Sequence, residues 1–133
     1  MKKLRIIKLF TLAAIWAALN SASAATLSDK GKQFLSGYEK AHTALAADDL
    51  NAAKAAANDL GSEGPELSKS SSLKEARTAF EKLSTKAKQL AAGQPGYYVY
   101  YCPMLKKDWV QTSTITANPY AGKEMVGCGQ IQK

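Results

Sequence analysis

Four sulfur-containing residues stand in two pairs in the last third of the sequence: Cys102 with Met104, and Met125 with Cys128. The chain has no other cysteine, and its third methionine is the initiator. Thiolate and thioether sulfurs are soft ligands, which select soft metals such as Cu(I), whereas magnesium, calcium and manganese prefer oxygen. Zinc fits less well, because structural zinc sites use cysteine and histidine, and thioether is not among its usual ligands. The four residues therefore predict a soft-metal site.

The spacing within each pair allows both members to reach one metal ion. Cys102 and Met104 stand at i and i+2, so they share a face if the backbone is extended, and Pro103 stiffens that backbone. Met125 and Cys128 stand at i and i+3, so they converge from one helical turn or from a tight loop in which Gly127 gives freedom. Two such pairs would form a three- or four-coordinate site.

A disulfide between the two cysteines is the alternative that the same residues leave open. Cysteines in exported proteins commonly pair, and closing the loop from 102 to 128 would stabilise a small domain by roughly 3.5 kcal/mol in the chain-entropy model. Met104 and Met125 would then be core filler, which is the usual role of methionine. Their positions beside both cysteines favour the metal instead.

Residues 1–24 have the pattern of a secretory signal peptide. Basic residues come first, an apolar run over 9–19 follows, and Ala22-Ser23-Ala24 supplies small residues for cleavage. The apolar run is shorter than the roughly 20 residues that span a bilayer, so we expect no stable membrane insertion after cleavage. The exported part would be one mature domain over 25–133.

Net charge argues against a nucleic-acid partner. The formal charge of +7 falls to +3 after cleavage, because the leader holds four cations and no acid: Lys2, Lys3, Arg5 and Lys8. The remaining charges form no basic patch interleaved with aromatic side chains, which nucleic-acid binding would need.

The sequence also lacks the residue patterns of common enzymes: there is no Cys/His or Ser/His/Asp grouping, no glycine-rich phosphate loop and no C-x-x-C motif. We expect a protein that is not an enzyme.

Apolar periodicity predicts three helices in the first part of the mature domain, residues 25–93. The first begins near the cap Ser28, the second follows a cap at Asp48 or Asp49, and the third begins at the capping box of Ser72 and Glu75. Segments 61–65 and 68–72 are expected to be a flexible connection. The apolar stripes comprise Phe34, Tyr38, Ala41 and Leu45; then Leu50, Ala53, Ala57 and Leu60; then Leu73, Ala76, Phe80, Leu83, Ala87 and Leu90.

The second part, residues 94–133, holds all the sulfur and is rich in aromatic residues and glycine. Residues 97–102 favour a strand, which would place Tyr98, Tyr100, Cys102 and Met104 on one face. Residues 118–122 predict a turn, and a short final strand around 128–132 could pair back on the first. The expected fold is mainly α: a small three-helix up-down bundle followed by a sulfur-rich module with a short β-hairpin.

The module resembles a known bacterial family of domains of unknown function. The matching segments are Y-C-P-M at 101–104, D-W at 108–109 and N-P-Y-A-G-K-E-M-V-G-C-G at 118–129. Members of that family are small exported proteins or the C-terminal ends of periplasmic copper and silver efflux adaptors. Many have histidine where this chain has Tyr101, and the spacer before the Asp-Trp pair is shorter here. The resemblance implies a periplasmic carrier or buffer of Cu(I) or Ag(I) that serves an efflux component.

Three other residues could contribute to such a site. His42, the only histidine, lies beside the first apolar stripe, where a lone histidine is more often structural or solvated than a metal ligand. Trp109 and Tyr120 are expected to pack, and they could form an apolar shell around the sulfur. The functional alternative from another class is a disulfide-stapled helical adaptor or interaction module without metal.

Overall fold

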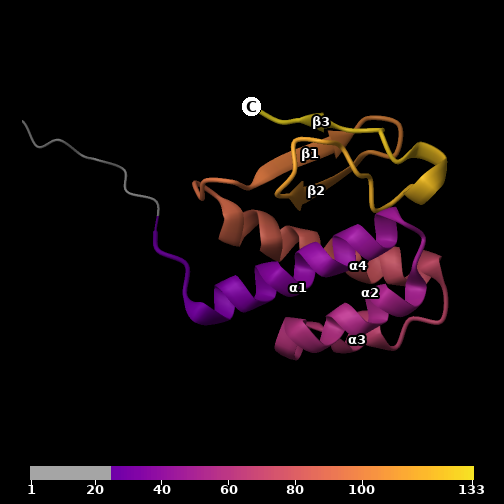
Figure 1. The fold of residues 1–133 in the computed structure, drawn as a ribbon, viewed down its shortest axis with the longest axis horizontal. Coiled ribbons are helices and arrows are strands. Elements are labelled where there is room, and N and C mark those ends of the chain that lie inside the picture. Colours follow the sequence, from indigo (N-terminus) through magenta and orange to yellow (C-terminus); the bar gives the residue numbers. More distant parts are fainter. Residues whose placement is uncertain (1–24) are drawn as a thin grey trace, which may run out of the picture.

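The computed structural model describes residues 25–133, and the leader expected over 1–24 lies outside them. The fold is mainly helical, with three main helices, α1 (Asp29–Ala46), α2 (Leu50–Ala56) and α4 (Leu73–Ala91), and a small antiparallel sheet. The sheet lies beside α1 and α4, and α2 lies on the opposite side of these helices (Figure 1). The prediction of a mainly α fold with three main helices is confirmed.

The three predicted helix starts are confirmed by side-chain caps. Ser28 Oγ accepts the amide of Gly31, Asp49 Oδ1 accepts that of Ala52, and Ser72 Oγ accepts that of Glu75. The expected capping box is altered at α4, because the Glu75 carboxylate binds the amide and hydroxyl of Ser71 at 2.8 and 2.9 Å. These hydrogen bonds lower the pKa of the Glu75 carboxyl.

The connection between α2 and α4 is structured, which corrects the expectation of a flexible segment. A 3-10 helix covers Ala57–Glu63, and the short helix α3 covers Pro65–Ser68. Proline suits a first helical position because its missing N–H is not needed there. Leu67 is fully buried, so this segment is anchored to the core.

The core lies between α1 and α4 and extends to the sheet. The ring of Tyr38 stacks on that of Phe80 with centroids 4.6 Å apart. Small alanines elsewhere in the seams allow close helix approach. Most predicted stripe residues are buried, whereas Leu50, Leu73 and Leu90 are half-buried at its margin.

The sheet has three strands in the order β2-β1-β3, with β1 (Tyr98–Cys102) in the middle. The predicted pairing of the last strand, β3 (Gln130–Ile131), on the first is confirmed by the partners Tyr100↔Ile131 and Tyr101↔Gln130. Strand β2 (Lys107–Gln111) was not predicted, and it pairs antiparallel with β1 along its whole length. The expected hairpin is therefore one part of a three-stranded sheet.

Candidate functional site

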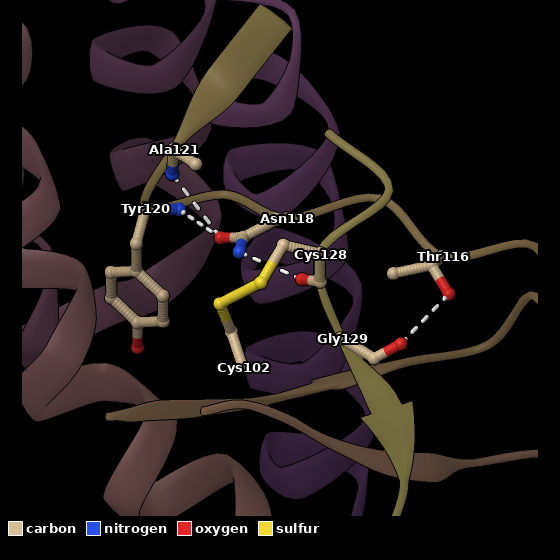
Figure 2. The surroundings of a disulfide bond; sticks show 7 residues. All are labelled: Cys102, Thr116, Asn118, Tyr120, Ala121, Cys128 and Gly129. Carbon is tan, nitrogen blue, oxygen red and sulfur yellow. Dashed lines mark hydrogen bonds between the residues drawn. A yellow bond between two sulfur atoms is a disulfide. The ribbon is translucent and has the colours of Figure 1, made fainter. Parts of the chain in front are cut away.

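The structure joins Cys102 and Cys128 in a disulfide, with the two Cα atoms 5.5 Å apart. The bond links the end of the central strand β1 to the segment between the 3-10 helix η2 (Gly122–Met125) and β3 (Figure 2). The sequence left a metal site and a disulfide open, and the structure has the disulfide. It also shows that the tertiary fold brings these two sulfurs together from distant segments.

Cys102 lies in the core, where solvent does not reach it. The residue is fully buried on β1, and Tyr100 of the same strand stacks on Trp109 of β2 with ring centroids 5.6 Å apart. A Cβ added to Gly129 would approach Trp109 Cη2 to 2.5 Å, so glycine next to Cys128 lets the chain pass over the indole. The expected packing role of Trp109 is confirmed.

Asn118 holds the segment that carries Cys128. Its fully buried side chain donates from Nδ2 to the Cys128 carbonyl at 2.8 Å. Its Oδ1 accepts the amides of Tyr120 and Ala121 at 2.9 and 3.2 Å, which closes the predicted turn (Figure 2). Asparagine favours such turns because its side chain bonds the backbone two residues on. Asn118 thus ties the turn at 118–122 directly to the disulfide.

Arg77 and Asp48 connect the same turn to the helices. Arg77 donates from Nε to the Pro119 carbonyl at 2.8 Å and from Nη2 to Asp48 Oδ1 at 2.5 Å. Asp48 Oδ2 also accepts the amide of Lys123 at 3.1 Å. The hydrogen bond from Arg77, aided by that amide, lowers the pKa of the Asp48 carboxyl. Asp48 therefore positions the module, whereas Asp49 alone caps α2.

Gly122 lets the turn approach this ion pair. Its φ is +60°, which favours glycine. A Cβ at this position would overlap Asp48 Oδ1 and lie 2.5 Å from Arg77 Nη2. The requirement is thus both conformational and steric.

The two methionines that neighbour the cysteines in the sequence lie in different environments. Met104 is 73% exposed, because the strand ends at Cys102 and the chain turns before β2. This corrects the expectation that Met104 shares the buried face of Tyr100 and Cys102, and it excludes core filling for Met104. Met125 is half-buried against the core, and its carbonyl accepts the Cys128 amide at 2.9 Å. The sequence left one helical turn and a tight loop open for Met125 to Cys128, and this hydrogen bond closes a turn between them.

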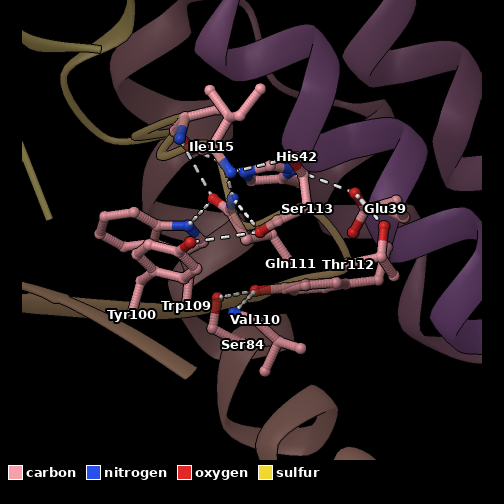
Figure 3. A network of polar contacts seen from close by, with 12 residues as sticks. Glu39, His42, Ser84, Tyr100, Trp109, Val110, Gln111, Thr112, Ser113 and Ile115 are labelled. Carbon is pink, nitrogen blue, oxygen red and sulfur yellow. Dashed lines mark hydrogen bonds and ion pairs between the residues drawn. The ribbon is translucent and has the colours of Figure 1, made fainter. Parts of the chain in front are cut away.

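His42 on α1 belongs to a polar network that links this helix to the loop after β2 (Figure 3). Its buried ring places Nε2 2.7 Å from the Ala117 carbonyl, so this nitrogen donates and is not free to bind a metal. Nδ1 lies 3.6 Å from Glu39 Oε1 and has no hydrogen-bond partner within residues 25–133. Burial raises the pKa of Glu39, but contacts with His42 and Thr112 outweigh it and leave that pKa lowered.

Gln111 organises the loop that leads to Asn118, a role that sequence reasoning missed. Its Oε1 accepts from Trp109 Nε1 at 2.9 Å and from the Ala117 amide at 3.2 Å. Its Nε2 donates to the carbonyls of Ser113 and Ile115 at 2.8 and 2.7 Å (Figure 3). A buried glutamine that satisfies four backbone and side-chain groups fixes the path of the loop.

The described residues contain no metal site built from His, Cys, Asp and Glu alone. Among residues 25–133, no three or more of these side chains are arranged to hold a metal ion. A site that includes methionine sulfur is a separate case, which this observation does not address.

None of the helices in this range is long and apolar enough to cross a membrane. No family model, curated protein or solved structure matches the chain.

Proposed function

We propose that this protein is an exported carrier or buffer of Cu(I) or Ag(I) that binds the metal when Cys102 and Cys128 are reduced. The observation that supports this proposal is that the fold joins the two cysteine sulfurs, and that a methionine stands two or three positions from each cysteine in the sequence. The helices, as an up-down bundle, would support the module. The resemblance of the module to periplasmic copper and silver proteins supports the same function.

The residues fit a soft metal in one redox form only. Cysteine binds metal as thiolate, and the disulfide consumes both thiolates, so the oxidised form lacks the main ligands. After reduction, the pairing of β1 and the Asn118 bond to Cys128 would keep the two thiols close together. The exposed Met104 thioether is free of core packing and is therefore available as a further ligand.

A titration of the reduced and oxidised forms tests this proposal. We expect reduced protein, kept without oxygen, to take one equivalent of Cu(I) from a chromogenic chelator, and the disulfide form to take none with comparable affinity. The Cys102→Ser, Cys128→Ser double variant is the control for the ligands. Tight Cu(I) binding by that variant, or equal binding by both redox forms, would place the metal elsewhere and reject the proposal.

The second candidate function is a disulfide-stapled interaction module without metal. The disulfide itself favours it, together with the exposed apolar side chains of Met104 and Val126, which are 73% and 41% exposed close to the two cysteines in the sequence. Under this proposal an efflux component or another periplasmic protein would contact the oxidised form. The same titration separates the two candidates, because the adaptor binds no Cu(I) in either form.

A further inference from the structure

The two halves of the disulfide differ in their access to solvent. Cys102 is fully buried at the end of the central strand β1. Cys128 is half-buried in a loop that follows the exposed residues Val126 and Gly127. A Cβ added to Gly127 would meet nothing within 4 Å, so the space beside this loop is open. Approach is therefore open on one side of the bond.

Thiol–disulfide exchange depends on which sulfur an incoming thiolate can reach. We infer that low-molecular-weight thiolates open this disulfide at Cys128. The thiolate sulfur bonds to Cys128 Sγ, the Cys102–Cys128 bond breaks, and its electron pair leaves with Cys102 as thiolate. The product is a mixed disulfide on Cys128 and a free Cys102 inside the module.

Two physical effects oppose each other in this step, and access decides between them. Burial disfavours the charged thiolate, so Cys102 is the poorer leaving group, and this alone would direct attack to Cys102. Attack at Cys102, however, requires the fully buried end of β1 to open first. The loop around Cys128 needs no such opening. Cys128 is thus the entry sulfur, and Cys102 is the resolving thiol.

The geometry also predicts the fate of the adduct. Cys102 stays fixed in β1, and Asn118 keeps holding the Cys128 carbonyl. The Cys102 thiolate can therefore attack Cys128 Sγ again and expel the external thiolate, which restores the disulfide. The mixed disulfide should be short-lived unless acid traps it or a second thiolate releases Cys128 as a thiol. None of these steps needs a metal, so this inference stands apart from the proposed metal binding.

Acid trapping of the wild-type protein tests the site of attack. Oxidised protein is mixed with excess isotopically labelled glutathione, quenched with acid at short times, and analysed by mass spectrometry with peptide mapping. We expect a single adduct on Cys128. An adduct on Cys102, equal adducts on both cysteines, or no adduct at all would overturn the inference.

Single-cysteine variants supply a matched measurement. Cys102→Ser leaves only the Cys128 thiol, and Cys128→Ser leaves only the Cys102 thiol. With an aromatic disulfide reagent under native conditions, we expect the Cys128 thiol to react at least about tenfold faster, because exposure controls thiol reactivity. Each rate is divided by the rate in denaturant, and circular dichroism checks that the helices persist. Equal native rates in folded variants would contradict the assignment.

Discussion

The hydroxyl of Tyr38 lies 2.7 Å from Oγ of Ser84, and this contact belongs to a directed series of buried and part-buried hydrogen bonds. Ser84 Oγ lies 2.9 Å from the hydroxyl of Tyr120, which donates to the Asp108 carbonyl at 2.9 Å. At the other end, the Val110 amide donates to the Tyr38 oxygen at 3.1 Å. An amide only donates and a carbonyl only accepts, so each hydroxyl must donate toward Asp108.

This series of hydrogen bonds joins the helices to the free edge of the sheet. Strand β2 lies at one edge, and the backbone groups of Asp108 and Val110 that bind the hydroxyls point away from β1. Unpaired groups on an edge strand invite pairing with another chain. Tyr38 and Tyr120 satisfy them instead, so the same contacts dock the module and close its edge.

Tyr38→Phe should destabilise the fold because it breaks this series of hydrogen bonds. The substitution keeps the ring that stacks on Phe80 but leaves the Val110 amide without its acceptor. A buried polar group that loses its partner costs about 1–3 kcal/mol. Denaturant unfolding should show a loss in that range. Tyr101→Phe is the control, because its hydroxyl makes no hydrogen bond within residues 25–133, and it should change stability little. If both substitutions lowered the free energy of unfolding equally, the hydrogen bonds of Tyr38 would make no specific contribution to stability.

The same two tyrosines predict a loss of stability at alkaline pH. Burial raises the pKa of Tyr38 well above its ordinary value near 10, and burial raises the pKa of Tyr120 as well. Their stabilisation is complete below the unfolded pKa of about 10 and is lost as pH rises toward the folded values, since the unfolded chain then holds fewer protons. Each tyrosine should lower the unfolding free energy by about 1.4 kcal/mol per pH unit in that window.

Unfolding in urea between neutral and strongly alkaline pH measures this slope. Lysines also titrate there, so the comparison is with Tyr38→Phe, which removes one of the two groups. The slope of that variant should be shallower by the contribution of one tyrosine. An identical slope would show that Tyr38 ionises equally in both states.

Asn118→Asp should weaken the segment that carries Cys128. The carboxylate can still accept the amides of Tyr120 and Ala121, but it loses the donor to the Cys128 carbonyl and faces that oxygen with negative charge. We expect a loss of about 1–3 kcal/mol at neutral pH. Acid should restore part of it, because a protonated carboxyl can donate again. The exposed Asn58→Asp is the control, and faster reduction of the disulfide in Asn118→Asp alone is the second readout.

Local signals predicted much of this fold, whereas contacts between distant segments were missed. Ser28 and Ser72 cap their helices through residues three positions away, so a short window of sequence contains the whole signal. Strand β2 begins with the charged pair Lys107-Asp108 and becomes a strand through its pairing with β1. Neither segment alone reveals that pairing.

The candidate site follows the same division. The sequence identified Cys102 and Cys128, but their contact is a property of the tertiary fold, so a metal site and a disulfide could not be separated. The face of Met104 was predicted wrongly because the strand ends at Cys102. Gln111 and Arg77 were missed because their partners lie in loops whose paths the sequence pattern does not fix.

Met104→Leu and Met125→Leu test whether the methionines act as ligands. Met104 is exposed, so its substitution should change the unfolding free energy by less than about 0.5 kcal/mol. Met125 packs against the core, and a swap of similar volume should cost under about 1.5 kcal/mol. Each substitution deletes a thioether, so Cu(I) affinity of the reduced protein should fall clearly and fall further in the double variant.

Val126→Leu is the matched control, because it alters an exposed apolar side chain beside Met125 without removing sulfur. It should leave both stability and Cu(I) affinity near wild type. Chelator competition gives the affinities, and the buried Trp109 gives a fluorescence signal for unfolding. A double methionine variant that binds Cu(I) like the wild type would limit the ligands to the two cysteines. If stability fell sharply while affinity held, Met125 would be a packing residue and the disulfide-stapled module would gain support.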